Sequence, residues 1–264
     1  MKNHSESRSP IVTDKAKLQR EQDFHDRRFS QDTERQRKVG KFYKITKSIQ
    51  QAKEKTLFDS SKGARVIEYG CGTGSYAFKL AQNGAELVTG IDISPVAIEK
   101  AQAIAIKQGV DSRTSFEVMN AENLEFAPNS YDLICGSGIL HHLEIDLAMD
   151  SIVKVLQPDG KAIFVEPLGH NFLINLYRRL TPSIRSEDEH PLLDQDLVSF
   201  KQYFHQVNIR YFYLTSLGAS LIAGKPGFNF ALKSLELLDS ALLKLPGIKK
   251  QAWMVLIELS RPIK

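Results

Sequence analysis

Glu68-Tyr69-Gly70-Cys71-Gly72-Thr73-Gly74 decides the fold, because this stretch joins a β-rich apolar run, residues 65–69, to an amphipathic helical run. Glycines suit a tight strand-to-helix turn, where a side chain would forbid the backbone angles, and they let a ligand approach the main chain. The helix start beyond the turn offers free N–H groups. The stretch therefore predicts a ligand-binding loop at the carboxyl end of a strand.

The chain beyond residue 64 alternates short β-rich runs with helical runs, which is typical of βαβ units and a parallel sheet. Helices are expected after the first, second and fourth strands, and a loop after the third. Residues 214–245 are apolar and helical, with an interruption at 224–227, and burial is the first expectation for them. The predicted strands are residues 65–69, 86–91, 115–118, 131–135, 161–166, 207–213 and 252–259. The pattern predicts a doubly wound α/β domain.

Three further elements follow the glycine loop in a fixed order. Asp92 closes the second strand 18 residues after Gly74, the distance at which an acidic side chain reaches a ribose diol in a doubly wound site. Asn120-Ala121-Glu122 follows the third strand, and the fourth strand ends in small residues that include Gly136. Ser75 stands where a dinucleotide-binding loop would have its third glycine, which argues against NAD-dependent hydride transfer.

The order of these elements resembles the class I S-adenosylmethionine (SAM)-dependent methyltransferases over roughly residues 64–167. The motifs that carry the resemblance are Glu68-Tyr69-Gly70-Cys71-Gly72-Thr73-Gly74, Asp92, Asn120-Ala121-Glu122-Asn123-Leu124, Gly138-Ile139-Leu140-His141-His142-Leu143 and Leu156-Gln157-Pro158-Asp159-Gly160-Lys161. The resemblance implies a Rossmann-like, seven-stranded, mostly parallel sheet whose last strand runs antiparallel. It also implies SAM as the cofactor, lying over the strand ends.

The resemblance also implies roles for individual residues. Asp92 would hold the ribose hydroxyls, and Asn120, where many relatives have Asp, would offer an amide oxygen to the adenine amino group. Tyr43 would close over the cofactor from the N-terminal extension. The expected cofactor-binding residues are Glu68, Gly70, Cys71, Gly72, Gly74, Asp92, Ile93, Asn120, Ala121, Glu122, Gly136 and Tyr43.

Methyl transfer is an in-line displacement that needs alignment, exclusion of water and sometimes the removal of one proton. The candidate bases after the fourth and fifth strands are His141, His142, Glu166 and His170. Packing at a helix start explains the histidine pair equally well, and Glu166 could instead bind the SAM amino group. A helical lid is predicted at about residues 168–205, with Tyr177, Arg178 and Arg179 as candidate substrate-binding residues.

No metal is predicted. The run Glu187-Asp188-Glu189-His190 holds ligand types, but consecutive helical residues do not share a face, and a loop would need further ligands.

Residues 1–60 are predicted to form a disordered tail and a helical extension of two helices, broken near Gly40, and residues 61–264 the methyltransferase domain. The formal charge is only +4, which is far below that of a dedicated nucleic-acid binder. Cys71 and Cys135 lie at strand-like runs rather than in a disulfide framework, and no transmembrane segment is predicted. A cytoplasmic monomer or homodimer is therefore expected.

The leading hypothesis is methylation of O, N or C on a small metabolite, with a hydrophobic or anionic acceptor. An RNA methyltransferase is an alternative, suggested by the basic residues of the N-terminal region, but interspersed acids dilute that charge. A SAM-binding partner protein without catalysis is another, because no obligatory base can be identified. The apolar residues 214–245 could line a pocket, a dimer surface or a membrane-facing patch.

Overall fold

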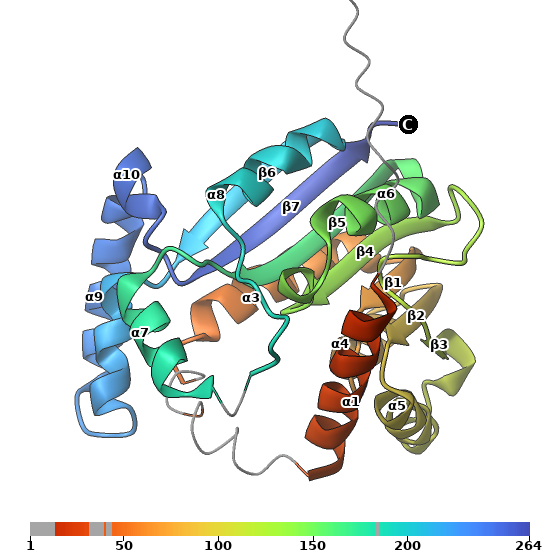
Figure 1. Ribbon diagram of the computed structural model, residues 1–264, viewed down its shortest axis with the longest axis horizontal. Helices are drawn as coiled ribbons and strands as arrows, with labels where there is room; N and C mark the ends of the chain where they lie inside the picture. Colours follow the sequence, from red (N-terminus) through yellow and green to blue (C-terminus); the bar gives the residue numbers. More distant parts are fainter. Residues whose placement is uncertain (1–13, 32–39, 41–43, 183–184) are drawn as a thin grey trace, which may run out of the picture.

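The computed structural model describes residues 14–31, 40, 44–182 and 185–264. Its centre is a seven-stranded sheet with strand order β3-β2-β1-β4-β5-β7-β6 (Figure 1). β7 pairs antiparallel with both of its neighbours, and the other pairs are parallel. The strands are β1 (Arg65–Tyr69), β2 (Leu87–Asp92), β3 (Thr114–Val118), β4 (Tyr131–Ser137), β5 (Leu156–Pro167), β6 (Phe204–Phe212) and β7 (Met254–Pro262). The predicted fold class, with its antiparallel last strand, is confirmed.

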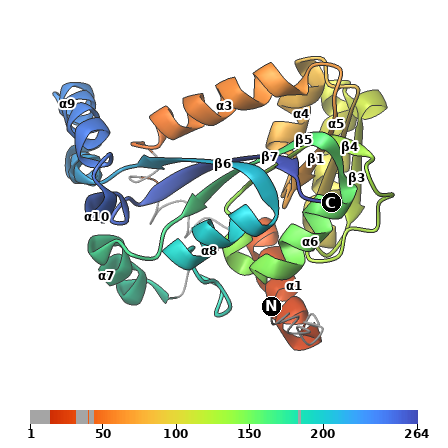
Figure 2. The same ribbon diagram turned by 90° about the horizontal axis from the view of Figure 1, so that it is seen from above.

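Helices cover both faces of the sheet (Figure 2): α3, α4 and α5 lie on one face, and α6 and α8 lie on the other. Successive strand residues alternate between the two cores: Val66 packs with the first layer and Ile67 with the second. The helices are α1 (Lys15–Gln31), α3 (Lys47–Ser61), α4 (Ser75–Gln82), α5 (Pro95–Gln108), α6 (Ile145–Val155), α7 (Phe172–Leu180), α8 (Asp194–Ser199), α9 (Phe228–Leu242) and α10 (Pro246–Lys249).

The predicted boundaries hold best in the first half of the domain. β1 has the predicted bounds, and the loop expected after the third strand is present. α5 begins where Ser94 accepts a hydrogen bond from the backbone of Ala97, and it ends at Gly109 with φ 65°. The two N-terminal helices correspond to α1 and α3; Gly40, the expected break, has helical backbone, and its neighbours lie outside the described residues. β5 begins at Leu156, earlier than predicted.

The expectation of burial for residues 214–245 is wrong for much of their surface. They form a 3₁₀ helix, η5 (Thr215–Ile222), and then α9, and Figure 2 shows α9 beyond the end of the sheet. Leu221, Phe230 and Leu237 are 81%, 79% and 75% exposed. Because an element at the end of the sheet has a packing partner on one side only, its outer apolar residues stay in solvent.

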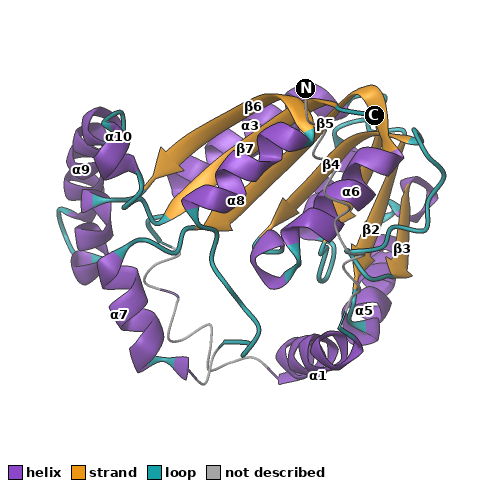
Figure 3. Ribbon diagram, turned by 45° about the horizontal axis from the view of Figure 1, so that its top comes forward, coloured by secondary structure: helices purple, strands orange, loops and turns teal. Residues whose placement is uncertain are grey.

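The order of the strands reverses between β1 and β4, since β2 and β3 lie to one side and β5 to the other. At such a switch point a crevice opens outside the carboxyl ends of the strands, and ligands bind there in open α/β sheets. Figure 3 shows α1 and α7 flanking the side of the sheet to which the arrowheads of β2, β3 and β4 point. None of the described helices is long and apolar enough to cross a membrane.

Candidate active site

The glycine loop between β1 and α4 has the backbone that its sequence demands. Gly70 and Gly72 have φ of 66° and 52°, in the left-handed region that disfavours side chains. A Cβ on Gly70 would lie 2.9 Å from the side chain of Ile139. The backbone N–H of Gly72 donates to Oδ2 of Asp92 at 2.8 Å, and the N–H of Ser94 donates to Oδ1 at 2.9 Å. Asp92 therefore fastens the glycine loop to the end of β2.

A cavity of about 370 Å³ lies outside the carboxyl ends of β1, β2 and β4. This volume falls within the range of about 300–1,000 Å³ that small-molecule and cofactor sites occupy. The cavity contains most of the residues expected to bind the cofactor, namely Glu68, Gly70, Cys71, Gly72, Asp92, Ile93, Asn120, Ala121 and Glu122. The chain thus brings the loops after β1, β2, β3 and β4 together around one space.

Three of the residues expected to bind the cofactor are not among the residues that line this cavity. Gly74 caps α4 with φ 81°, and a Cβ there would lie 2.8 Å from the ring of Phe116. Gly136 lies where a Cβ would meet Ile139 and Phe164. Both glycines permit close packing behind the cavity rather than lining it. Tyr43 lies outside the described residues.

The helix α1 forms a wall of the cavity that the sequence did not predict. Its contributions are Lys17, Leu18, Glu21, His25, Arg28 and Phe29. A Cβ on Gly72 would lie 3.0 Å from the ring of Phe29, so α1 passes close over the glycine loop. The sequence held one signal, the spacing of four between Glu21 and His25, which puts both side chains on one helix face.

Two buried ionisable side chains stand at the β1 end of the cavity. Lys53 of α3 is 1% exposed, donates to Oγ of Ser137 at 2.5 Å and lies over the ring of Tyr76. Burial lowers the pKa of Lys53. Burial also raises the pKa of Glu68 to about 7, although Lys53 and the N–H of Ala77 favour its ionised form. The pair gives the cavity a buried amine and an acid whose pKa lies near neutrality.

Glu166 and His141 form a buried pair behind the loop after β4. Nδ1 of His141 is 2.8 Å from Oε2 of Glu166, whose other oxygen accepts from the backbone N–H groups of Ile139 and Leu140. Glu166 is fully buried and lines neither cavity described here. It therefore orients the imidazole and holds the loop, whereas His141 faces the cavity.

A second cavity of about 170 Å³ adjoins the first, and Gly138 and His141 line both. Of the predicted substrate-binding residues, Tyr177 and Arg178 line it and Arg179 does not. Arg185 and Glu189, 2.9 Å apart, complete its charged side. Its apolar lining comes from Ile49, Ile174, Trp253 and Met254.

The remaining two candidate bases have different surroundings. His142 lines the first cavity, and its Nδ1 lies 3.1 Å from Oε2 of Glu21. His170 lines neither cavity, and instead its Nε2 accepts from the backbone N–H of Asp194 at 3.2 Å, where α8 begins. His170, a candidate base because it follows β5, thus stabilises the start of α8 instead.

Comparison with known proteins identifies the fold and its family. A family model described as a methyltransferase domain matches residues 60–206, more than half of the chain. The chain belongs to the class I SAM-dependent methyltransferases. SAM, as the sequence resemblance implied, is the cofactor of this family.

Two curated relatives each match less than half of the chain. 27-O-demethylrifamycin SV methyltransferase of Amycolatopsis mediterranei is 34% identical over 38% of this chain and 37% of its own length. A tRNA U34 carboxymethyltransferase of Sulfurimonas denitrificans is 33% identical over 39% and 34%. The matched segment is thus about a third of each relative. Among solved structures, phosphoethanolamine N-methyltransferase 2 of Haemonchus contortus with SAM has TM-score 0.63 at 19% identity, covering 96% of this chain and 61% of that one.

Proposed function

We propose that this protein transfers the methyl group of SAM to a small-molecule acceptor, with SAM in the larger cavity and the acceptor in the smaller one. The observation that carries the proposal is the wall the two cavities share, made by Gly138 and His141. An in-line displacement needs donor and acceptor on opposite sides of one narrow contact. Two adjoining cavities of unequal size supply that arrangement.

The residues of the larger cavity fit SAM. Asp92 has lone pairs left for a ribose diol after accepting from Gly72 and Ser94, and the absence of Cβ atoms at positions 70 and 72 leaves the main chain accessible. Lys53 and Glu68 complement the carboxylate and the ammonium of the methionine end. Asn120 offers its amide oxygen, which already accepts from Glu122, to the adenine end. SAM bound there supplies an electrophilic methyl group.

His141 is the candidate general base. If Nδ1 donates its proton to Glu166, Nε2 carries the lone pair and takes a proton from the acceptor. Glu166 is a positioning residue here, because its second oxygen is held by two backbone N–H groups. This arrangement suits acceptors that lose a proton on methylation, such as a hydroxyl, a phenol or an amine.

The smaller cavity favours an acceptor with an apolar body and an anionic group. Arg178 and Arg185 both line it, and the Nε atom of each is buried without a hydrogen-bond partner among the described residues. Burial lowers the pKa of Arg178 to about 10, so this side chain stays charged at neutral pH. Glu189 is the only carboxylate on this lining, which leaves a net positive charge among the described residues. Of the predicted lid, about residues 168–205, we assign only the segment before α8 to this role, because Leu197 and Phe200 pack in the core and cannot move with a lid.

An RNA acceptor has less support. Two basic side chains of α1 are paired with acids, Lys17 with Glu144 at 2.7 Å and Arg20 with Asp188 at 2.8 Å. Pairing leaves little charge for phosphates, so a strongly salt-dependent affinity for RNA would contradict the small-molecule proposal.

The test combines methyl-labelled SAM with a library of hydroxyl- and amine-bearing carboxylates and phosphates. We expect label in at least one acceptor, and we expect His141→Gln to lower kcat by about 10²–10⁴-fold with little change in SAM affinity. His170→Gln is the matched control, since its imidazole lies outside both cavities. Transfer that is unchanged in His141→Gln would remove the base assignment, and SAM binding without any transfer would favour a non-catalytic SAM-binding protein.

A further inference from the structure

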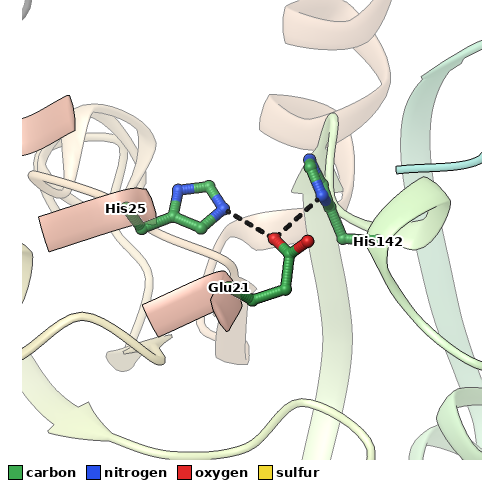
Figure 4. Close-up of side chains that lie close together, drawn as sticks. All are labelled: Glu21, His25 and His142. Carbon is green, nitrogen blue, oxygen red and sulfur yellow. Dashed lines mark ion pairs between the residues drawn. The ribbon is translucent and has the colours of Figure 1, made fainter. Parts of the chain in front are cut away.

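The inner face of α1 and the loop after β4 bring together a carboxylate and two imidazoles that the proposed methyl transfer does not use (Figure 4). Glu21 and His25 share one face of α1, and His142 comes from a 3₁₀ helix, η2 (Leu140–His142). Ligating atoms of the three side chains all lie within 4.8 Å of one another. All three line the larger cavity.

The spacing of these atoms suits a single ion. Oε2 of Glu21 lies 3.5 Å from Nε2 of His25 and 3.1 Å from Nδ1 of His142. In a tetrahedral zinc site with ligands at about 2.0–2.2 Å, neighbouring ligand atoms are about 3.3–3.6 Å apart. Small side-chain adjustments would place all three atoms at coordination distance from one centre.

Two of the three ligating atoms form an ion pair with each other but no aligned hydrogen bond. Oε2 of Glu21 and Nδ1 of His142 are buried, and neither has a hydrogen-bond partner among the described residues, even though they lie 3.1 Å from each other. The two atoms are therefore close but not aligned as donor and acceptor. Buried polar atoms are rarely left unsatisfied in this way, and a shared cation would satisfy both.

We propose that Glu21, His25 and His142 bind one Zn²⁺ ion, with the fourth coordination position open toward the larger cavity. Two imidazoles and one carboxylate suit a transition metal, whereas Mg²⁺ and Ca²⁺ prefer oxygen ligands. Three protein ligands with one open position are an arrangement that Zn²⁺ commonly accepts. Such an ion connects α1 to the loop after β4, so it fixes the helix over the cavity.

A neighbouring group, His141, His142 and Glu189, also has ligating atoms within 4.8 Å. There Nδ1 of His141 contacts Glu166, and Glu189 pairs with Arg185, so both are engaged elsewhere. The group with Glu21 is the better site, because two of its ligating atoms, Oε2 of Glu21 and Nδ1 of His142, are buried without an aligned hydrogen bond. The run 187–190 alone suggested no metal, and the ligands proposed here come from two other elements.

The first experiment titrates tag-free, full-length protein with Zn²⁺ in competition with a chromophoric chelator. We expect one Zn²⁺ per chain, and at least ~10-fold weaker binding in Glu21→Gln, His25→Gln and His142→Gln. His205→Gln is the matched control, because His205 is an exposed histidine of β6 outside both metal-ligand groups. His25→Gln keeps the test decisive if His142→Gln does not fold, since His25 is only partly buried.

The second experiment follows tryptic cleavage within α1, which contains several lysines and arginines. Zn²⁺ should slow this cleavage at least threefold in the wild type and in His205→Gln, and should not slow it in His25→Gln. Neither readout requires SAM or an acceptor, so failure here is separate from failure of the methyl-transfer proposal. The site would be overturned if the wild type does not bind Zn²⁺, or if the three ligand variants bind it as tightly as the wild type. It would also be overturned if Zn²⁺ leaves the cleavage of α1 in the wild type unchanged.

Discussion

The helices α1 and α3 both come from the polar N-terminal extension, yet they attach to the domain in different ways. α3 buries Ile49 and Leu57 completely in the core on one face of the sheet. α1 contributes no residue to either apolar core, and its buried side chain is Glu21. Its contacts with the domain include a bidentate contact from Arg20 to Asp188 at 2.8 Å, beside the approach of the Phe29 ring to Gly72.

This difference shows how one cavity combines two kinds of wall: α3 is a fixed wall, and α1 is a releasable wall that can move away from the cavity. Burial of apolar surface stabilises an element by roughly 25 cal/mol per Å² and is not weakened by charge screening, whereas exposed ion pairs contribute little and are screened. α3 therefore supplies Lys53 from a rigid support, and α1, without a bound Zn²⁺ ion, covers the cavity with a helix that opens at low cost. A cofactor that must enter and leave needs the second kind of wall.

The largest expected effect is on stability, from truncation in α3. Leu57→Ala should lower the free energy of unfolding by about 2–5 kcal/mol, because it leaves a cavity in the core. The matched change in α1, Leu18→Ala, should cost less than about 1 kcal/mol, because Leu18 is only partly buried. Urea unfolding measures both. Equal losses would show that α1 is as firmly packed as α3.

The next largest effect is on SAM affinity, from Lys53 of the fixed wall α3. Lys53→Met should weaken SAM binding by at least ~10-fold, since a charge-assisted contact to the carboxylate contributes about 1.5–3 kcal/mol. Stability below pH 7 should fall little, because Glu68, whose pKa burial raises to about 7, is then mostly protonated and needs no cation. Calorimetry and thermal unfolding separate the two effects. Unchanged SAM affinity would show that Lys53 does not contact the cofactor.

A pH effect follows from Glu68, on the strand beside this wall. Because burial raises its pKa to about 7, the contribution of Glu68 to the stability of the SAM-free protein falls as pH rises from about 4.5 to 7, where the unfolded chain ionises first. An ammonium group favours ionised Glu68, so SAM affinity should rise between about pH 6 and pH 7.5, with proton release on binding. Calorimetry in buffers of different ionisation enthalpy detects this proton. Glu68→Gln should flatten the profile, and a profile like that of the wild type would assign the proton elsewhere.

The smallest expected effect is on the releasable wall. Arg20→Ala removes an exposed contact of α1, and we expect SAM to dissociate less than about threefold faster, with the midpoint of thermal unfolding unchanged. Raising the salt concentration should produce the same change in the wild type. Stopped-flow dissociation measures it. A large loss of stability would show that α1 belongs to the folding core.

The sequence predicted the parts of the site that depend on neighbouring residues. β1 and its glycine loop were found because burial on both faces and the required turn leave a continuous apolar run and spaced glycines. The Lys53 contribution was not found, since a lysine in a polar helix carries no sign that its side chain turns inward. The position of α1 over the cavity was missed for the same reason, because it depends on pairs such as Arg20 with Asp188, far apart in the chain.

The most direct test of SAM binding in the larger cavity is a calorimetric titration of Asp92→Ala against the wild type, with circular dichroism confirming that both are folded. The matched control is Asp111→Ala, an exposed aspartate outside the cavity. We predict that Asp92→Ala weakens SAM binding at least ~10-fold, because the ribose loses a charged acceptor, and that Asp111→Ala binds like the wild type. Equal SAM affinity in Asp92→Ala and the wild type would contradict the account.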